Sequence, residues 1–119
     1  MNASKLAKWF GIILLVIGVL GFVPGITSDG SLLGIFEVDA LHNVIHLVSG
    51  LLALVFAASA PKTFFKVFGV VYLLLALVGF VQGDTVLGLV GVNMADNVLH
   101  LVLGVVALLV GFKKDTMPV

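Results

Sequence analysis

The sequence predicts an all-α protein: a four-helix transmembrane bundle formed by tandem duplication of a two-helix hairpin, with the two repeats parallel. Three observations predict this fold class. First, 61% of the 119 residues are hydrophobic and 10% are charged, whereas a soluble domain has about 25% charged residues. Second, the chain contains four apolar segments, each long enough to cross a bilayer. Third, its two halves match one another.

The composition also excludes several classes of function. The mean hydropathy is +1.32, and a water-soluble globule of this kind would expose large apolar patches that aggregate. Because the chain has no cysteine, disulfides, thiolate metal sites and cysteine nucleophiles are excluded. Six basic and six acidic residues balance, which leaves no polybasic surface for nucleic acid. The chain has no phosphate-binding loop and no His-Glu-x-x-His pattern, and therefore favours a non-enzymatic protein.

The four apolar segments span residues 5–23, 40–58, 62–81 and 94–112. A bilayer core requires roughly 17–25 mostly apolar residues in a helix, so each segment is predicted to cross the membrane once. The first segment, with lysines before an apolar run, is also typical of a signal peptide. Its pattern recurs in the third segment, in mid-chain, and we therefore interpret it as a helix of the bundle.

Signals for helix boundaries support these limits. Asp39 and Asn93 are predicted N-caps of the second and fourth helices, and Asp96 follows Asn93 at the spacing of a capping box. Pro61 suits the first turn of the third helix, and Pro24 ends the first. The loops left between the helices are short, so residues 1–119 form a single integral membrane domain.

Charge predicts the orientation of the bundle. All six lysines fall on one side of the four segments, and five of the six acids fall on the other, with Asp115 on the lysine side. The lysines are Lys5, Lys8, Lys62, Lys66, Lys113 and Lys114. Since cytoplasmic loops carry the excess of lysine and arginine, both termini are expected in the cytoplasm.

The internal match relates two hairpins. Residues 32–57 align with 86–111, and residues 8–25 align with 66–83. The first repeat covers about residues 5–58 and the second about residues 62–112. Because each repeat crosses the membrane twice, both have the same orientation and are related by an axis along the membrane normal.

One polar stripe lies on each of the second and fourth helices, with Asn, His and Gly at positions i, i+3 and i+7. The residues are Asn43, His46 and Gly50, and Asn97, His100 and Gly104. This spacing places each set on one helix face, and polar groups in a bilayer face the bundle interior. We expect the two histidines at the same depth, facing each other.

Two interpretations fit these stripes. In one, they are structural clamps, since Asn and His hydrogen-bond across transmembrane helices. In the other, His46 and His100 bind a divalent metal or a haem-like tetrapyrrole, with Asn43 and Asn97 fixing the imidazoles from behind. Haem propionates, however, favour cations that the outer side lacks, and a zinc site needs more ligands than two histidines.

Two further polar residues lie near the outer mouth. His42 of the first repeat corresponds to Asp96 of the second, each at the third position of its helix. We expect them to pair across the axis between the repeats, and they are also the nearest source of additional metal ligands.

Small residues and outer loops complete the bundle. The expected helix-packing residues are Gly11, Gly18, Gly50, Gly69, Ala76 and Gly104, because small side chains let membrane helices approach closely. The outer loops, residues 27–39 and 83–93, contain apolar runs with glycine. Each loop either folds back as a lid over the bundle mouth or lies in the membrane interface.

The residues 42–46, reading His-Asn-Val-Ile-His, follow a Gly-Phe-Val-Pro run at residues 21–24 and a Leu-Gly pair at 33–34. In these features the chain resembles a family of small four-helix bacterial membrane proteins with a His-Asn-x-x-His motif and no known function. The second repeat departs from the pattern at Gln82 and Asp96. The resemblance implies a bacterial cytoplasmic membrane and no particular activity.

The sequence therefore predicts a small integral membrane protein, most simply a non-enzymatic module or an accessory or assembly subunit of a membrane complex. Metal or tetrapyrrole binding is the alternative, and small-solute or proton handling is the third. The expected partners are the lipid bilayer and either further copies of the chain or a larger membrane complex.

Overall fold

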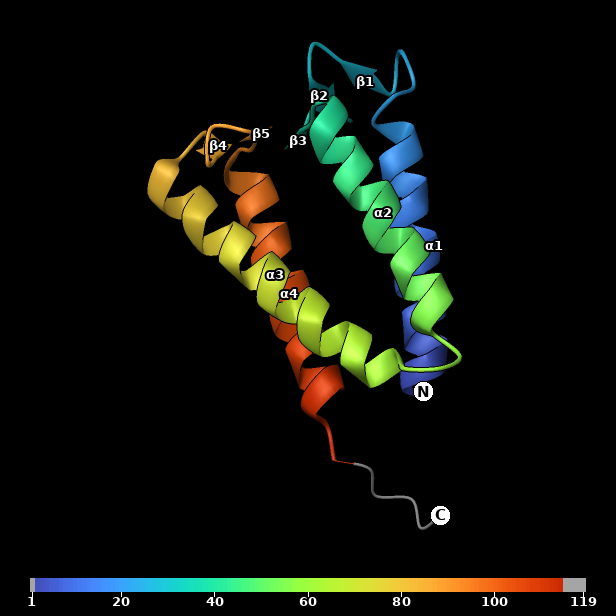
Figure 1. Cartoon of the computed structure of the whole chain (residues 1–119). Helices are drawn as coiled ribbons and strands as arrows, with labels where there is room; N and C mark the ends of the chain where they lie inside the picture. Colours follow the sequence, from blue (N-terminus) through green and yellow to red (C-terminus); the bar gives the residue numbers. More distant parts are fainter. Residues whose placement is uncertain (1, 115–119) are drawn as a thin grey trace.

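The computed structural model describes residues 2–114, and the chain is mostly helical (Figure 1). The helices are α1 (Ala3–Leu20), α2 (Ala40–Phe56), α3 (Pro61–Gln82) and α4 (Met94–Phe112). Three of them, α1, α3 and α4, are long and apolar enough to span a membrane, whereas α2 is a shorter apolar helix of 17 residues. Asp115 lies outside the described residues.

The helix starts follow the predicted capping signals. The Asp39 side chain accepts a hydrogen bond from His42 N at 2.7 Å at the start of α2, and Asn93 and Asp96 form the capping box of α4. Pro61 occupies the first turn of α3. The predicted end of the first helix was wrong by three residues, because the chain leaves the helix after Leu20 and turns before Pro24 is reached.

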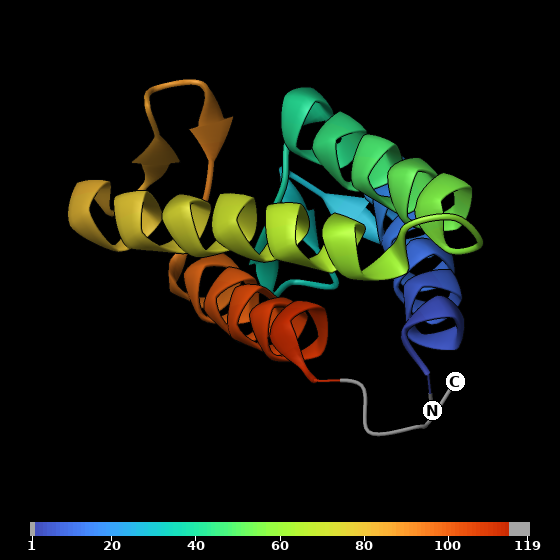
Figure 2. The same cartoon turned by 60° about the horizontal axis from the view of Figure 1, so that its bottom comes forward.

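The helices form two hairpins. Figure 1 shows α1 beside α2 and α3 beside α4, with the two pairs diverging toward one end, and Figure 2 shows the same pairing from below. Glycines permit the close approach inside each pair. A Cβ atom at Gly50 would lie 2.8 Å from Gly11 O, and one at Gly104 would lie 2.8 Å from Leu73 N.

The other small residues lie in the same seams. A Cβ at Gly11 would lie 2.7 Å from Leu54, one at Gly18 would lie 2.7 Å from Leu47, and one at Gly69 would lie 2.7 Å from Leu108. Ala76 is fully buried. These contacts tie α1 to α2 and α3 to α4 within each hairpin.

An apolar core joins the two hairpins at the end of the bundle where the lysines lie, here called the lysine end. Phe10 of α1 meets the ring of Phe65 of α3 edge to face, with centroids 5.0 Å apart. Phe68 of α3 stacks on Tyr72 at 4.0 Å. Ala53 and Ala107 fill the same cluster from α2 and α4. The hairpins are therefore held together below the level of the predicted histidines.

Short antiparallel strands form a lid at the opposite end. The strands are β1 (Thr27–Ser28), β2 (Ser31–Leu32) and β3 (Phe36–Glu37) in one sheet, and β4 (Thr85–Val86) and β5 (Val90–Gly91) in the other. We call residues 27–37 the first lid and residues 85–91 the second lid. Val86 and Val90 of the second lid pack against Ile45 of α2 and Val78 of α3. Of the two expectations for these loops, the structure shows the folded-back lid.

Each lid turns at a leucine followed by a glycine. Leu33 and Leu87 have φ of 56° and 57°, and Gly34 and Gly88 have φ of 70° and 69°. Two successive residues with positive φ are typical of the tight turns that match the twist of short hairpins. The leucine side chains at both turns are exposed.

Candidate functional site

All three histidines of the chain meet between α2 and α4, just beneath the lids. The ring centroids of His42 and His46 lie 4.7 Å apart, those of His42 and His100 lie 5.4 Å apart, and those of His46 and His100 lie 6.0 Å apart. Each ring is at most 4% exposed. The structure thus brings His46 and His100 together and adds His42 as the third corner of a triangle.

Each of the three histidines has a buried ring nitrogen without a hydrogen-bond partner. One ring nitrogen from each histidine lies within 4.8 Å of the other two. His42 Nε2, His46 Nδ1 and His100 Nδ1 are buried without a hydrogen-bond partner. A buried polar atom without a partner costs about 1–3 kcal/mol, so three in one place indicate a missing interaction.

The backbone of the second lid fixes the ring of His42. His42 Nδ1 lies 3.1 Å from Gly91 O. Because a carbonyl oxygen only accepts, Nδ1 carries the proton and donates it. The buried Nε2 is then left with its lone pair free, which is the tautomer that a metal ligand requires.

Carboxylates lie beside the histidines and hold the lids. Asp39 accepts from His42 N and from Gly91 N, both at 2.7 Å. Asp96 Oδ2 accepts from Glu37 N at 3.1 Å and from Asn93 N at 2.9 Å. His42 and Asp96, expected to pair, instead each bind backbone of the lid that belongs to the other hairpin.

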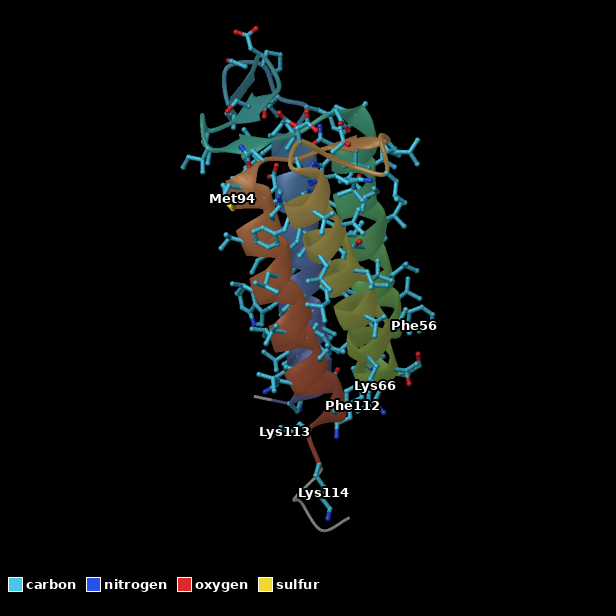
Figure 3. All side chains as sticks on the ribbon, turned by 90° about the vertical axis from the view of Figure 1, so that its left-hand side faces the viewer. Phe56, Lys66, Met94, Phe112, Lys113 and Lys114 are labelled. Atoms are coloured by element: carbon cyan, nitrogen blue, oxygen red, sulfur yellow. The ribbon has the colours of Figure 1, made fainter. Side chains whose placement is uncertain are left out.

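The lysines lie far from these acids along the helices. In Figure 3, Met94 marks the lid end of α4, while Lys66, Lys113 and Lys114 lie at the opposite end. The carboxylates of Asp39 and Asp96 thus lack a lysine partner among the described residues.

A small cavity lies between the three imidazole rings and the second lid. Its volume is about 10 Å³, and its remaining walls come from Tyr72, Ile45, Leu75 and the lid valines. A space of roughly 10–15 Å³ holds one water molecule. The cavity therefore accommodates a single water-sized group, and it offers no room for the haem-like tetrapyrrole considered from the sequence.

The two asparagines of the polar stripes contact their own hairpins. Asn43 Nδ2 donates to Gly21 O at 3.0 Å. A methyl group at Gly21 would overlap Asn43 Oδ1, and one at Gly79 would overlap Asn97 Oδ1 in the same way. Asn43 therefore links α2 to the end of α1. Asn97 of α4 lies against α3 in the same way.

Tyr72 adds an aromatic wall that the sequence did not connect with the site. Its ring meets His100 edge to face, with centroids 5.5 Å apart, and its hydroxyl lies 2.9 Å from Ser49 Oγ. A buried tyrosine hydroxyl in an apolar helix requires a hydrogen-bond partner, but the sequence alone does not indicate that the partner is Ser49.

Comparison with known proteins supports a family and no function. A family model described as Domain of unknown function (DUF4383) matches residues 5–113, which include all three histidines. No curated protein and no solved structure matches the chain.

Proposed function

The chain belongs to the family described as a domain of unknown function (DUF4383). We propose that it is a small membrane protein that binds a divalent transition-metal ion through His42, His46 and His100. The observation that carries the proposal is the set of three buried imidazoles, contributed by both hairpins, whose ring nitrogens lie within 4.8 Å of one another. Each imidazole has a buried nitrogen without a partner.

The ligand set suits zinc and related ions. Imidazole is a preferred ligand of Zn²⁺, Cu²⁺ and Ni²⁺. In a tetrahedral zinc site with Zn–N of about 2.0–2.1 Å, the ligand nitrogens lie about 3.3 Å apart. The ring nitrogens, which lie within 4.8 Å of one another, must therefore move closer together when the ion binds. The cavity of about 10 Å³ has room for one water-sized group, so binding of the ion together with a water in the fourth position requires the surrounding side chains to move.

The charges nearby favour a dication. Three neutral imidazoles leave both positive charges of the ion uncompensated, which is costly in a membrane. Asp39 and Asp96 stand beside the cluster, one on the strand-to-helix junction of α2 and the other in the first turn of α4. Their two negative charges offset those of the ion without occupying its coordination positions.

The proposed ion joins the two hairpins. His42 and His46 belong to α2, and His100 belongs to α4. We therefore assign the ion a stabilising role in a non-enzymatic accessory module, while Asn43 and Asn97 act as clamps within their hairpins. Small-solute or proton handling has no comparable observation in its favour.

The same proposal includes tandem duplication and parallel repeats, with the termini in the cytoplasm. The support is the recurrence of the Leu-Gly turn in both lids and of the Asn–Gly contact in both hairpins. The lysine end would face the cytoplasm by the charge rule, and the metal site would then lie near the outer surface of a bacterial cytoplasmic membrane.

Metal titration of the purified protein in detergent micelles tests this function. Zn²⁺ binding is measured by calorimetry, and Co²⁺ binding is measured by its visible absorption. We expect one ion per chain and at least a tenfold weaker affinity in each of the variants His42→Ala, His46→Ala and His100→Ala. Asp29→Asn, at an exposed acid of the first lid, is the control and should bind as the wild type does. Absence of binding, or binding unaffected by the histidine variants, would refute the proposal.

A further inference from the structure

We propose that Asp39 is a positioning residue for the metal ligand His42 and acts through the backbone of Gly91. This inference rests on the proposed metal site. The contacts of Asp39 and Gly91 leave Nε2 of His42 without a proton, so that it can bind the ion.

Three hydrogen bonds form a closed circuit. Asp39 Oδ1 accepts from His42 N at 2.7 Å, Asp39 Oδ2 accepts from Gly91 N at 2.7 Å, and Gly91 O faces His42 Nδ1 at 3.1 Å. The carboxylate therefore binds both the helix that carries the histidine and the lid strand that orients it. Asp39 holds Gly91 by its N–H, and the carbonyl of the same residue, which belongs to the next peptide group, lies against the ring.

Two carboxylates crowd position 91. A Cβ atom there would lie 2.6 Å from Glu37 Oε2 and 3.2 Å from Asp39 Oδ2. A large side chain would push the strand away from the two carboxylates, and with it the carbonyl that accepts the hydrogen bond of His42 Nδ1–H.

The other half of the molecule provides a natural comparison. Asn93 is the N-cap of α4, as Asp39 is of α2, and Asn93 Nδ2 donates to Ile35 O of the first lid at 2.9 Å. Asp96 Oδ2 accepts from Glu37 N. Asp39 and Asn93 thus each bind the lid of the opposite hairpin. The residue that Asp39 binds, Gly91, also contacts an imidazole, whereas Asn93 binds Ile35, for which no such contact is present among the described residues.

The consequence is a fixed tautomer and a ligand of higher basicity. Groups that accept a hydrogen bond from a ligating imidazole orient the ring, and their loss typically costs 10–100-fold in metal affinity. Asp39 also contributes one of the two nearby negative charges.

The substitution Asp39→Asn tests the relay. Asparagine remains a good N-cap, but an NH₂ group replaces the second carboxylate oxygen and cannot accept from Gly91 N while Oδ1 accepts from His42 N. Two measurements follow: ¹⁵N NMR of the histidine rings in the metal-free protein, and the Zn²⁺ affinity. We expect a single Nδ1–H tautomer of His42 in the wild type, a mixture of tautomers in Asp39→Asn, and a 10–100-fold weaker affinity in that variant.

The matched control is Asn93→Ala, which removes the corresponding cap and lid contact of α4. It should leave the His42 tautomer unchanged and the affinity within about threefold of the wild type, less than the loss expected from a ligand's hydrogen-bond partner. Should Asp39→Asn fail to fold, Gly91→Val displaces the same carbonyl while leaving the cap of α2 intact.

The two proposals fail in different ways. If the wild type binds no Zn²⁺, the metal function is refuted, while the tautomer measurement still decides the relay. If the histidine variants lose the metal but Asp39→Asn keeps both the wild-type tautomer and the wild-type affinity, the relay is refuted and the metal site stands.

Discussion

Zinc should raise the stability of the wild-type protein by more than that of His100→Ala. His100 is the ligand that α4 contributes, whereas α2 contributes the other two. The ion therefore crosses the seam between the two hairpins, which diverge toward the lid end (Figure 1). Removing His100 leaves both remaining ligands on one helix, where an ion no longer ties α2 to α4.

The size of the effect follows from mass action. A ligand that binds the folded state alone, present at 100 times its Kd, stabilises that state by about 2.7 kcal/mol. For a chain of this size, 1 kcal/mol corresponds to about 4 °C in Tm, so the expected shift is about 10 °C. His100→Ala also loses the packing of the ring against Tyr72, and the comparison is therefore made within each variant, with and without Zn²⁺.

Circular dichroism during thermal unfolding in detergent micelles measures the shift. Mg²⁺ is the control ion, since it prefers oxygen ligands and retains its waters; it should produce no shift. An ion that bridges α2 and α4 through His100 is ruled out if Zn²⁺ stabilises His100→Ala as much as the wild type, or if it shifts the Tm of neither.

Three further predictions concern packing, the lid and acid. Gly21→Ala should destabilise the protein by about 2–4 kcal/mol in the same unfolding assay, because the new methyl group overlaps the Asn43 carboxamide and breaks its hydrogen bond to the Gly21 carbonyl; no loss of stability would show that α1 and α2 move apart freely. Leu87→Asn should stabilise by about 1 kcal/mol, since the leucine has φ of 57° and asparagine tolerates this region better; a loss of stability would mean that the exposed leucine makes a contact of its own. Bound Co²⁺ should be released on acidification with loss of its visible absorption, because the ligand histidines bind as neutral rings and protons compete with the metal; absorption that persists at pH 4 would exclude imidazole ligands.

Much of the helical framework could be predicted from local chemistry. Asp39, Asn93 and Pro61 each have an identifiable role in a first helical turn, and the structure uses all three in that way. The end of α1 was placed too late because apolar residues continue to residue 23, and hydropathy does not register where the backbone leaves the helix. Strands of two residues have no detectable periodicity, so the lid sheets were seen only as apolar loops.

The candidate site was predicted in part. Equal spacing on matched helices placed His46 and His100 at one depth, and the structure brings these rings together. His42 lies four residues before His46, a spacing that places both on one helix face, but its position in the first turn suggested the outer mouth. The sequence could not show where the lid lies relative to His42. In the structure β5 of the second half covers His42, which is therefore buried.

X-ray absorption at the zinc edge of the purified protein loaded with Zn²⁺ tests the central claim most directly. We expect one zinc per chain with three imidazole nitrogens at about 2.0 Å and a fourth, water-sized oxygen ligand. A protein that retains no zinc, or a zinc whose ligands are not imidazoles and are unchanged when all three histidines are replaced, would contradict it.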